Sequence, residues 1–299
     1  MVDVWSSRSV RLPRQMIHLE DFPFPVNEAI FLQWTSRTQR PPADRFDSQS
    51  SLLAQMIKLN RILLEINDVI TQTAASGSVN PVLEHTVHEL SQKLDDWHEA
   101  LPKYMHHTAE NLARYAAQGF GRLFVAVYLG YYHYCQLLFY QFLHENGRAS
   151  RESDFAKKCK AHAANLCRII YEAHAVRGCE VWYNMVGHIL VIASTVQIHT
   201  LLFGTDEVEI SAARGRLEKN FQILTQLREY WPMLDGCFER LQIFHEVCRK
   251  NMDTSFRMDQ WMLKFLSEFK EPITEKEEES PLIGLNSVAN IGTSPLGWV

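Results

Sequence analysis

Two adjacent aspartates and a glutamate one helical turn later are the residues whose types and spacing best suit metal chemistry. Asp95, Asp96 and Glu99 lie in the segment Asp-Asp-Trp-His-Glu, near the end of a stretch with helical periodicity. Residues three or four positions apart share a face of a helix, so these acids could hold Mg²⁺ and, through it, a diphosphate. A magnesium-dependent helical enzyme is therefore one hypothesis for this chain.

The acidic segment resembles the Asp-rich motif of class I terpenoid synthases, which are all-α enzymes of similar size. The second motif of that family starts with Asn/Asp-Asp and continues with Ser/Thr and Glu at helical spacing, downstream of the first. Here the nearest match is Asn67-Asp68 with Thr71, which lies upstream and has Ala75 where the acid belongs. Because the order is reversed and a ligand is missing, the favoured interpretation is a solvated helix flank, with the enzyme as the alternative.

Other signals for catalysis or metal binding are weaker. The sequence has no Gly-x-x-x-x-Gly-Lys phosphate loop, no Gly-x-Gly-x-x-Gly, no His-Glu-x-x-His and no Gly-x-Ser-x-Gly. His85 and His88 lie one turn apart, but no third ligand follows at helical spacing. We therefore predict a non-enzymatic chain with no catalytic residue, no metal site and no cofactor.

Composition narrows the class of protein further. The chain has 299 residues, 46% of them hydrophobic and 22% charged, which is ordinary for a globular protein. A net charge of -5 and a pI near 6.2 argue against a surface dedicated to nucleic acid. The six cysteines form no Cys-x-x-Cys pair, and no apolar segment follows Met1, so we expect reduced packing cysteines and an intracellular location.

Two long apolar runs are expected to form the core. They extend from Arg122 to His144 and from Met185 to Phe203, and each contains histidine and glutamine side chains that need hydrogen-bond partners. Buried helices of a helical domain are the favoured interpretation, with no membrane partner. A protein that spans the membrane at residues 123 to 143 and 185 to 203 is a third hypothesis.

The remaining periodicity is helical, and no run shows convincing strand alternation. Helices are expected at about residues 27–37, 48–77, 81–101, 122–146, 153–178, 181–203, 217–231, 234–248 and 258–269. We predict an all-α, irregular multi-helix domain over residues 1–269, with a proline-rich N-terminal segment. Residues 270–299, which contain Glu277-Glu278-Glu279, are predicted to be a disordered acidic tail.

A set of aromatic and proline landmarks follows the chain in order. They are Asp3 to Pro13, the step Asp21-Phe-Pro-Phe-Pro25, the helix end Trp97-His-Glu-Ala-Leu101-Pro102, the helix Phe124 to Phe142 with Tyr131-Tyr132-His133, Trp182 before an apolar helix, and Leu227 to Trp231. Together they resemble the regulatory middle-homology domain of fungal zinc-cluster transcription factors over about residues 1 to 265. In the first landmark, Val10 and Leu12 depart from the family's Gly-Arg-Pro-like turn.

The resemblance implies a nuclear domain that regulates RNA polymerase II transcription. Its implied partners are proteins of the transcription machinery or the rest of an activator, together with a small-molecule effector. Members of the family carry a Zn₂Cys₆ module, a basic linker and a dimerisation helix, none of which occurs in this sequence. We therefore expect a truncated product, a fragment or a regulator without its own DNA reader, and no direct DNA binding by this chain alone.

An effector would need a pocket, and the two apolar runs suggest its position. His133 and His188 lie in these runs, with Tyr132 and Trp182 close to them in sequence. Pockets between packed helices commonly hold small molecules where a few polar groups converge. We predict that Tyr132, His133, Trp182 and His188 border an effector pocket, the alternative being four side chains satisfied separately in a solid core.

Overall fold

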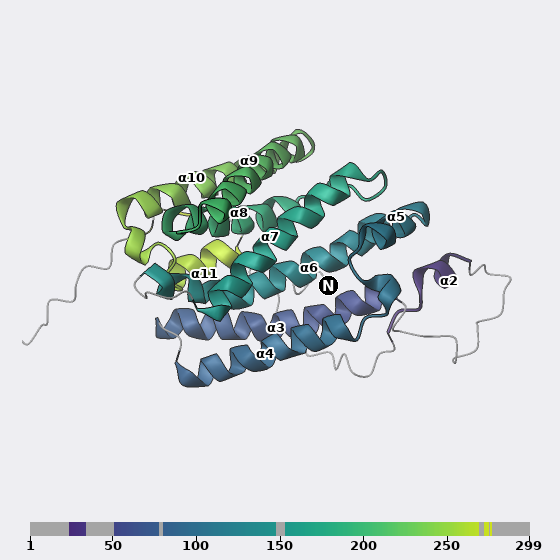
Figure 1. Ribbon diagram of the computed structural model, residues 1–299, viewed down its shortest axis with the longest axis horizontal. Helices are drawn as coiled ribbons and strands as arrows, with labels where there is room; N and C mark the ends of the chain where they lie inside the picture. Colours follow the sequence, from purple (N-terminus) through teal and green to yellow (C-terminus); the bar gives the residue numbers. More distant parts are fainter. Residues whose placement is uncertain are drawn as a thin grey trace, which may run out of the picture.

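Every regular element that the computed structural model describes is a helix, which confirms the predicted all-α class (Figure 1). The described residues are 24–33, 51–77, 80–147, 153–268, 272–274 and 276. The α-helices are α2 (Glu28–Gln33), α3 (Leu52–Ser76), α4 (Pro81–Glu99), α5 (Ala109–Ala117), α6 (Gly121–Tyr140), α7 (Asp154–Ala175), α8 (Met185–Phe203), α9 (Glu207–Tyr230), α10 (Asp235–Lys250) and α11 (Gln260–Ser267). Short 3₁₀ helices are η4 (Lys103–Met105), η5 (Gln141–Gly147), η6 (Pro232–Leu234) and η7 (Met252–Thr254).

Local side-chain chemistry sets several helix starts. The Asn80 carboxamide oxygen accepts from the Leu83 backbone N–H at 3.0 Å, and Pro81 occupies the first helical position of α4. Ser153 caps α7 in the same way through the Ala156 N–H. These caps satisfy backbone donors that have no partner inside the helix.

The central apolar run changes geometry earlier than predicted. Its α-helix ends at Tyr140, and the chain continues as the 3₁₀ helix η5 rather than reaching residue 146 as one α-helix. The Gln141 side chain lies at this change of geometry, and its Nε2 donates at 3.0 Å to the Leu138 carbonyl. A continuing α-helix would use that carbonyl for the amide of residue 142. The Gln141 Oε1 meanwhile accepts from Thr73 Oγ1 at 2.6 Å.

The helices lie side by side in a layered bundle, with α3 and α4 along one side and α9 and α10 along the other (Figure 1). Between them, α6 packs against α7, and the ring pairs Phe139–Phe155 and Tyr131–His162 show that these two helices are antiparallel. Helix α8 packs between α7 and α9, and α11 returns to contact α3. The last described helix is thus joined to the first long one.

Helices α6 and α8 supply the centre of the core. Almost every side chain of α6 is buried, which matches the prediction for the apolar run. Helix α8 is the one described helix long and apolar enough to cross a membrane, and 78% of that window is buried inside this structure. Its neighbours are other helices of the bundle, chiefly α7, α9 and α10.

All six cysteines are free and buried. Their sulfur atoms pack in the interior, and burial raises the pKa of both Cys237 and Cys248 to about 11. Thiols with such pKa values carry little thiolate at neutral pH and react slowly. The cysteines therefore fill space between helices, as the sequence predicts.

Three of the predicted features lie wholly or mainly outside the described residues. These are the landmark from Asp3 to Pro13, the step from Asp21 to Pro25 and most of the predicted tail. Within residues 270–299, Thr274 and Lys276 are described and contact α11: the Trp261 Nε1–H donates to the Thr274 carbonyl at 2.8 Å. Lys276 lies 2.6 Å from the Asp259 carboxylate.

Candidate functional site

The three acids at the end of α4 do not converge on one point. Asp96 and Glu99 are exposed, and Asp96 accepts a hydrogen bond from Gln92 at 2.7 Å. Asp95 is half-buried and turns towards α7, where Lys158 Nζ lies 3.6 Å from its carboxylate. Within the described residues, no group of three or more His, Cys, Asp or Glu side chains is placed to hold a metal ion.

His133 and His188 come together in the interior. Their ring centroids are 6.3 Å apart and both side chains are buried, which places α6 and α8 in contact at this level. His188 donates from Nε2 to the Leu266 carbonyl at 3.1 Å, so it caps the C-terminal turn of α11. Burial lowers the pKa of His133 to about 3 and holds that of His188 well below its ordinary value. Both rings are therefore neutral at pH 7.

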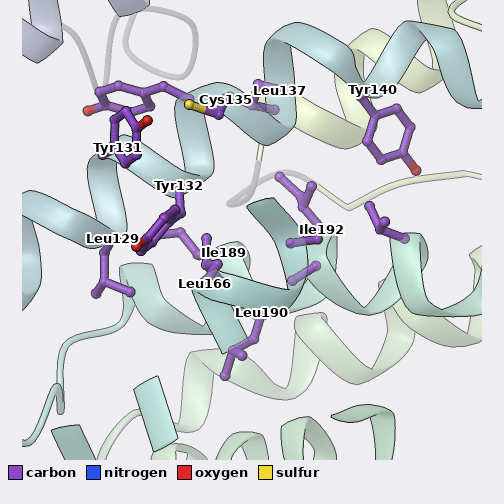
Figure 2. Packing of buried hydrophobic residues seen from close by; sticks show 14 of the residues in the cluster. Leu129, Tyr131, Tyr132, Cys135, Leu137, Tyr140, Leu166, Ile189, Leu190 and Ile192 are labelled. Atoms are coloured by element: carbon purple, nitrogen blue, oxygen red, sulfur yellow. The ribbon is translucent and has the colours of Figure 1, made fainter. Parts of the chain in front are cut away.

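Tyr132 lies on a different side of α6 from His133. Figure 2 shows its ring near Leu166 and Ile189, while Tyr131 lies on another side of the helix. The Tyr132 hydroxyl is 3.4 Å from Nδ1 of His107, whose Nε2 is 3.0 Å from the Glu172 carboxylate.

This chain of polar contacts ties the segment before α5 to both α6 and α7. The two nitrogens of the His107 ring face different helices, Nδ1 towards Tyr132 on α6 and Nε2 towards Glu172 on α7. Burial lowers the pKa of His107, and the nearby Glu172 carboxylate partly offsets that effect.

Trp182 lies in the connection between α7 and α8, and its contacts are with other residues than those of the two buried histidines. Its ring packs edge-on against His174, with centroids 4.5 Å apart, and is 5.1 Å from the ring of Tyr230. The Trp182 carbonyl accepts from the indole N–H of Trp231 at 2.7 Å. The connection is thereby fastened to the end of α9.

A surface pocket of about 590 Å³ opens beside these rings, and we call it the Trp182 pocket. Its walls come from the end of α7, the α7–α8 connection and the second half of α9. The lining residues are Tyr171, His174, Ala175, Trp182, Lys219, Gln222, Ile223, Gln226, Glu229 and Tyr230. A volume of this size suits a small organic molecule.

The Trp182 pocket combines aromatic walls with a balanced set of polar groups. Lys219 lies with its ammonium 4.4 Å from the centroid of the Tyr171 ring, and Glu229 supplies one carboxylate. Burial lowers the pKa of His174, so its ring adds no charge at neutral pH. Two glutamines, Gln222 and Gln226, provide amide donors and acceptors. Such a surface favours a planar ligand of low net charge that carries hydrogen-bonding groups.

The four residues predicted to border one pocket therefore lie in three places. His133 contacts His188, Tyr132 faces His107, and Trp182 alone lines the Trp182 pocket. Sequence reasoning missed the other residues of the pocket, among which the ring-bearing side chains are Tyr171 and His174 on α7 and Tyr230 on α9. Their spacing to Trp182 in the sequence gives no sign that the rings meet, because the contact depends on how α9 packs against α7. The effector role stays a prediction.

Comparison with protein-family models, with curated proteins and with solved structures finds no match for this chain.

Proposed function

We propose that this chain is a non-enzymatic regulatory domain of a transcription factor, that it acts in the nucleus, and that the Trp182 pocket is its effector site. The effector is a small planar molecule of low net charge. The partners are the rest of an activator or proteins of the transcription machinery, and the domain modulates RNA polymerase II transcription through them.

One observation supports this proposal above all others. Two landmarks of the family resemblance, Trp182 and the segment from Leu227 to Trp231, meet at the same pocket. The Tyr230 ring packs on Trp182, while Trp231 donates to the Trp182 carbonyl. Trp182 and Tyr230, which belong to two landmarks of the resemblance, are thus also aromatic residues in the wall of the Trp182 pocket, which is an arrangement suited to ligand recognition.

We expect this chain alone not to bind specific duplex DNA. Its net charge is -5, and specific readout requires clustered Arg and Lys side chains that reach phosphates and base edges. A gel-shift titration with the full chain at moderate salt measures this directly. Sequence-selective binding at nanomolar protein would contradict the expectation and would favour a DNA-reading role instead.

We also expect the chain to change transcription when it is tethered to DNA. The experiment fuses residues 1–299 to an unrelated DNA-binding module and measures a reporter gene in fungal cells. Trp182→Ala should alter the reporter response at least about threefold, because it removes the central ring of the pocket wall. Val208→Ala is the matched control, since Val208 is 76% exposed on α9 and lies outside the pocket.

Two results of the reporter experiment would count against the proposal. A fusion that leaves the reporter at the level of the DNA-binding module alone would argue against a regulatory role. A fusion that is active but indifferent to Trp182→Ala would retain the regulatory role and remove the pocket from it. Circular dichroism of the purified variants shows that each has folded.

A further inference from the structure

The two charged side chains that line the Trp182 pocket lie towards opposite ends of it. Lys219 and Glu229 are both exposed on α9, and their positions are separated by about 15 Å along the helix axis. Among the described residues, neither forms an ion pair. The amides of Gln222 and Gln226 lie between them on the same helix. The pocket therefore has a cationic end and an anionic end.

The wall opposite α9 keeps the same order. Tyr171 lies at the cationic end, because the Lys219 ammonium is 4.4 Å from the centroid of its ring. Trp182 lies at the anionic end, where its ring contacts that of Tyr230. His174 lies between the two, since it follows Tyr171 by one helical turn and its ring contacts Trp182. A row of rings thus extends from the cationic end of the pocket to the anionic end.

Two helix ends add to the negative potential at the anionic end. Helix α7 ends at Ala175 and α9 ends at Tyr230, and both residues line the pocket. The C-terminus of a helix carries roughly half a negative charge. Arg228, in the last turn of α9, does not line the pocket: it lies 3.5 Å from the Asp235 carboxylate, and its guanidinium is 5.2 Å from the centroid of the Phe238 ring. This end of the pocket therefore favours a cationic group.

We propose that the effector of the Trp182 pocket is an aromatic zwitterion, with its ammonium group at Glu229, its carboxylate at Lys219 and its ring against Trp182. Ammonium groups bind both carboxylates and the faces of aromatic rings, and a lysine ammonium binds a carboxylate through charge-assisted hydrogen bonds. A zwitterion has no net charge, in agreement with a lining that has one charge of each sign. The inference rests on the function proposed above, because it names the class of effector for the same pocket.

Isothermal titration of the full chain at constant ionic strength tests this inference with three biphenyl probes. The first carries an aminomethyl group and a carboxylate at opposite ends, the second only the aminomethyl group, and the third only the carboxylate. We expect one-to-one saturation with the first probe. The other two should bind at least about threefold more weakly, because each lacks one of the two ion pairs.

Substitutions at the two ends test the orientation of the ligand. Glu229→Gln should weaken the binding of both amine-bearing probes at least about threefold and leave the carboxylate-only probe unchanged. Lys219→Gln should weaken both carboxylate-bearing probes and leave the amine-only probe unchanged. Glu218→Gln is the matched control, because Glu218 is exposed on α9 and lies outside the pocket. Circular dichroism of the variants verifies that they are folded.

Three results would overturn the inference. They are no saturation with the zwitterionic probe, saturation that neither end variant weakens, and weakening that does not follow the charge of the probe. The reporter experiment tests the proposed function separately. A reporter that responds to Trp182→Ala, combined with a failed titration, would keep the effector site and remove the zwitterion. The expected titration with an indifferent reporter would keep the ligand class and remove the regulatory role.

Discussion

The protein should lose about 4 kcal/mol of unfolding free energy between pH 7 and pH 5 through two buried histidines. Burial lowers the pKa of His133 to about 3 and that of His199 to about 4, from an ordinary value of 6.5. Below pH 6.5 the unfolded chain therefore binds protons at these two histidines, whereas the folded chain does not bind them until the pH approaches the lower folded pKa values. Their stabilising effect is complete above pH 6.5 and is lost as the pH falls towards the folded pKa values.

The size of this effect follows from the width of the pH window. Because pH 5 lies about 1.5 units below the unfolded pKa of 6.5, protonation of each histidine stabilises the unfolded chain by about 2 kcal/mol at that pH. His188, whose pKa burial also holds well below 6.5, acts in the same direction. Since domains are stable by about 5–15 kcal/mol, acid unfolding should begin close to pH 5. Urea titrations followed by circular dichroism at both pH values measure the difference.

His199→Gln isolates one of these histidines. His199 donates from Nε2 to the Leu143 carbonyl at 3.0 Å, and a glutamine amide can donate to the same carbonyl without titrating. The loss between pH 7 and pH 5 should shrink by about 2 kcal/mol in this variant. His85→Gln is the surface control, because the side chain of His85 is 77% exposed. If wild type and His199→Gln lose equal unfolding free energy between pH 7 and pH 5, folding does not hinder protonation of His199 and the prediction is wrong.

The second large effect is expected at Trp97. Trp97→Ala should cost about 3–5 kcal/mol, because it leaves a cavity under α4. Trp97 is 7% exposed, and its ring stacks on Tyr131 with centroids 5.2 Å apart. The side chain belongs to the buried face of α4, which continues through Leu94 and Leu90.

Asp96→Ala is the matched control one position earlier. Asp96 is exposed, and its hydrogen bond comes from Gln92 on the same helix, so its loss should change stability by less than about 0.5 kcal/mol. Thermal and urea melts of both variants measure the two changes in stability. If the aspartate change destabilises the protein as much as the tryptophan change, the assignment of buried and solvated faces on α4 is wrong.

Features that depend on nearby residues were predictable from the sequence. Asn80 and Pro81 start α4 because a cap needs only a side chain and amides two or three residues away. The burial of α6 follows from its composition. Helix α5 was missed because only a short segment forms it, with Thr108 as the cap and few buried apolar residues to reveal the period.

Features that depend on distant residues were not predictable. Helix α6 changes to η5 where Gln141 meets Thr73, a residue on another helix that lies 68 positions earlier in the chain. The same limit applies to the predicted site. His133 and His188 do meet, whereas Tyr132 points elsewhere because neighbouring positions on a helix face different directions. Trp182 lies in the connection between α7 and α8, whose path the local sequence does not determine. In the Trp182 pocket the Tyr230 ring contacts the Trp182 ring, and no local sequence pattern predicts this contact.

The contact between α3 and α11 has a consequence for synthesis of the protein. The partner of α3 at this contact begins at Gln260, so the ribosome must add about 200 residues after the middle of α3 before α11 exists. At about 5–20 residues per second, this takes roughly 10–40 s. During that interval the side of α3 that α11 covers remains open on the nascent chain. In order of synthesis, the helix that covers this side of α3 is therefore made from almost the last described residues of the chain.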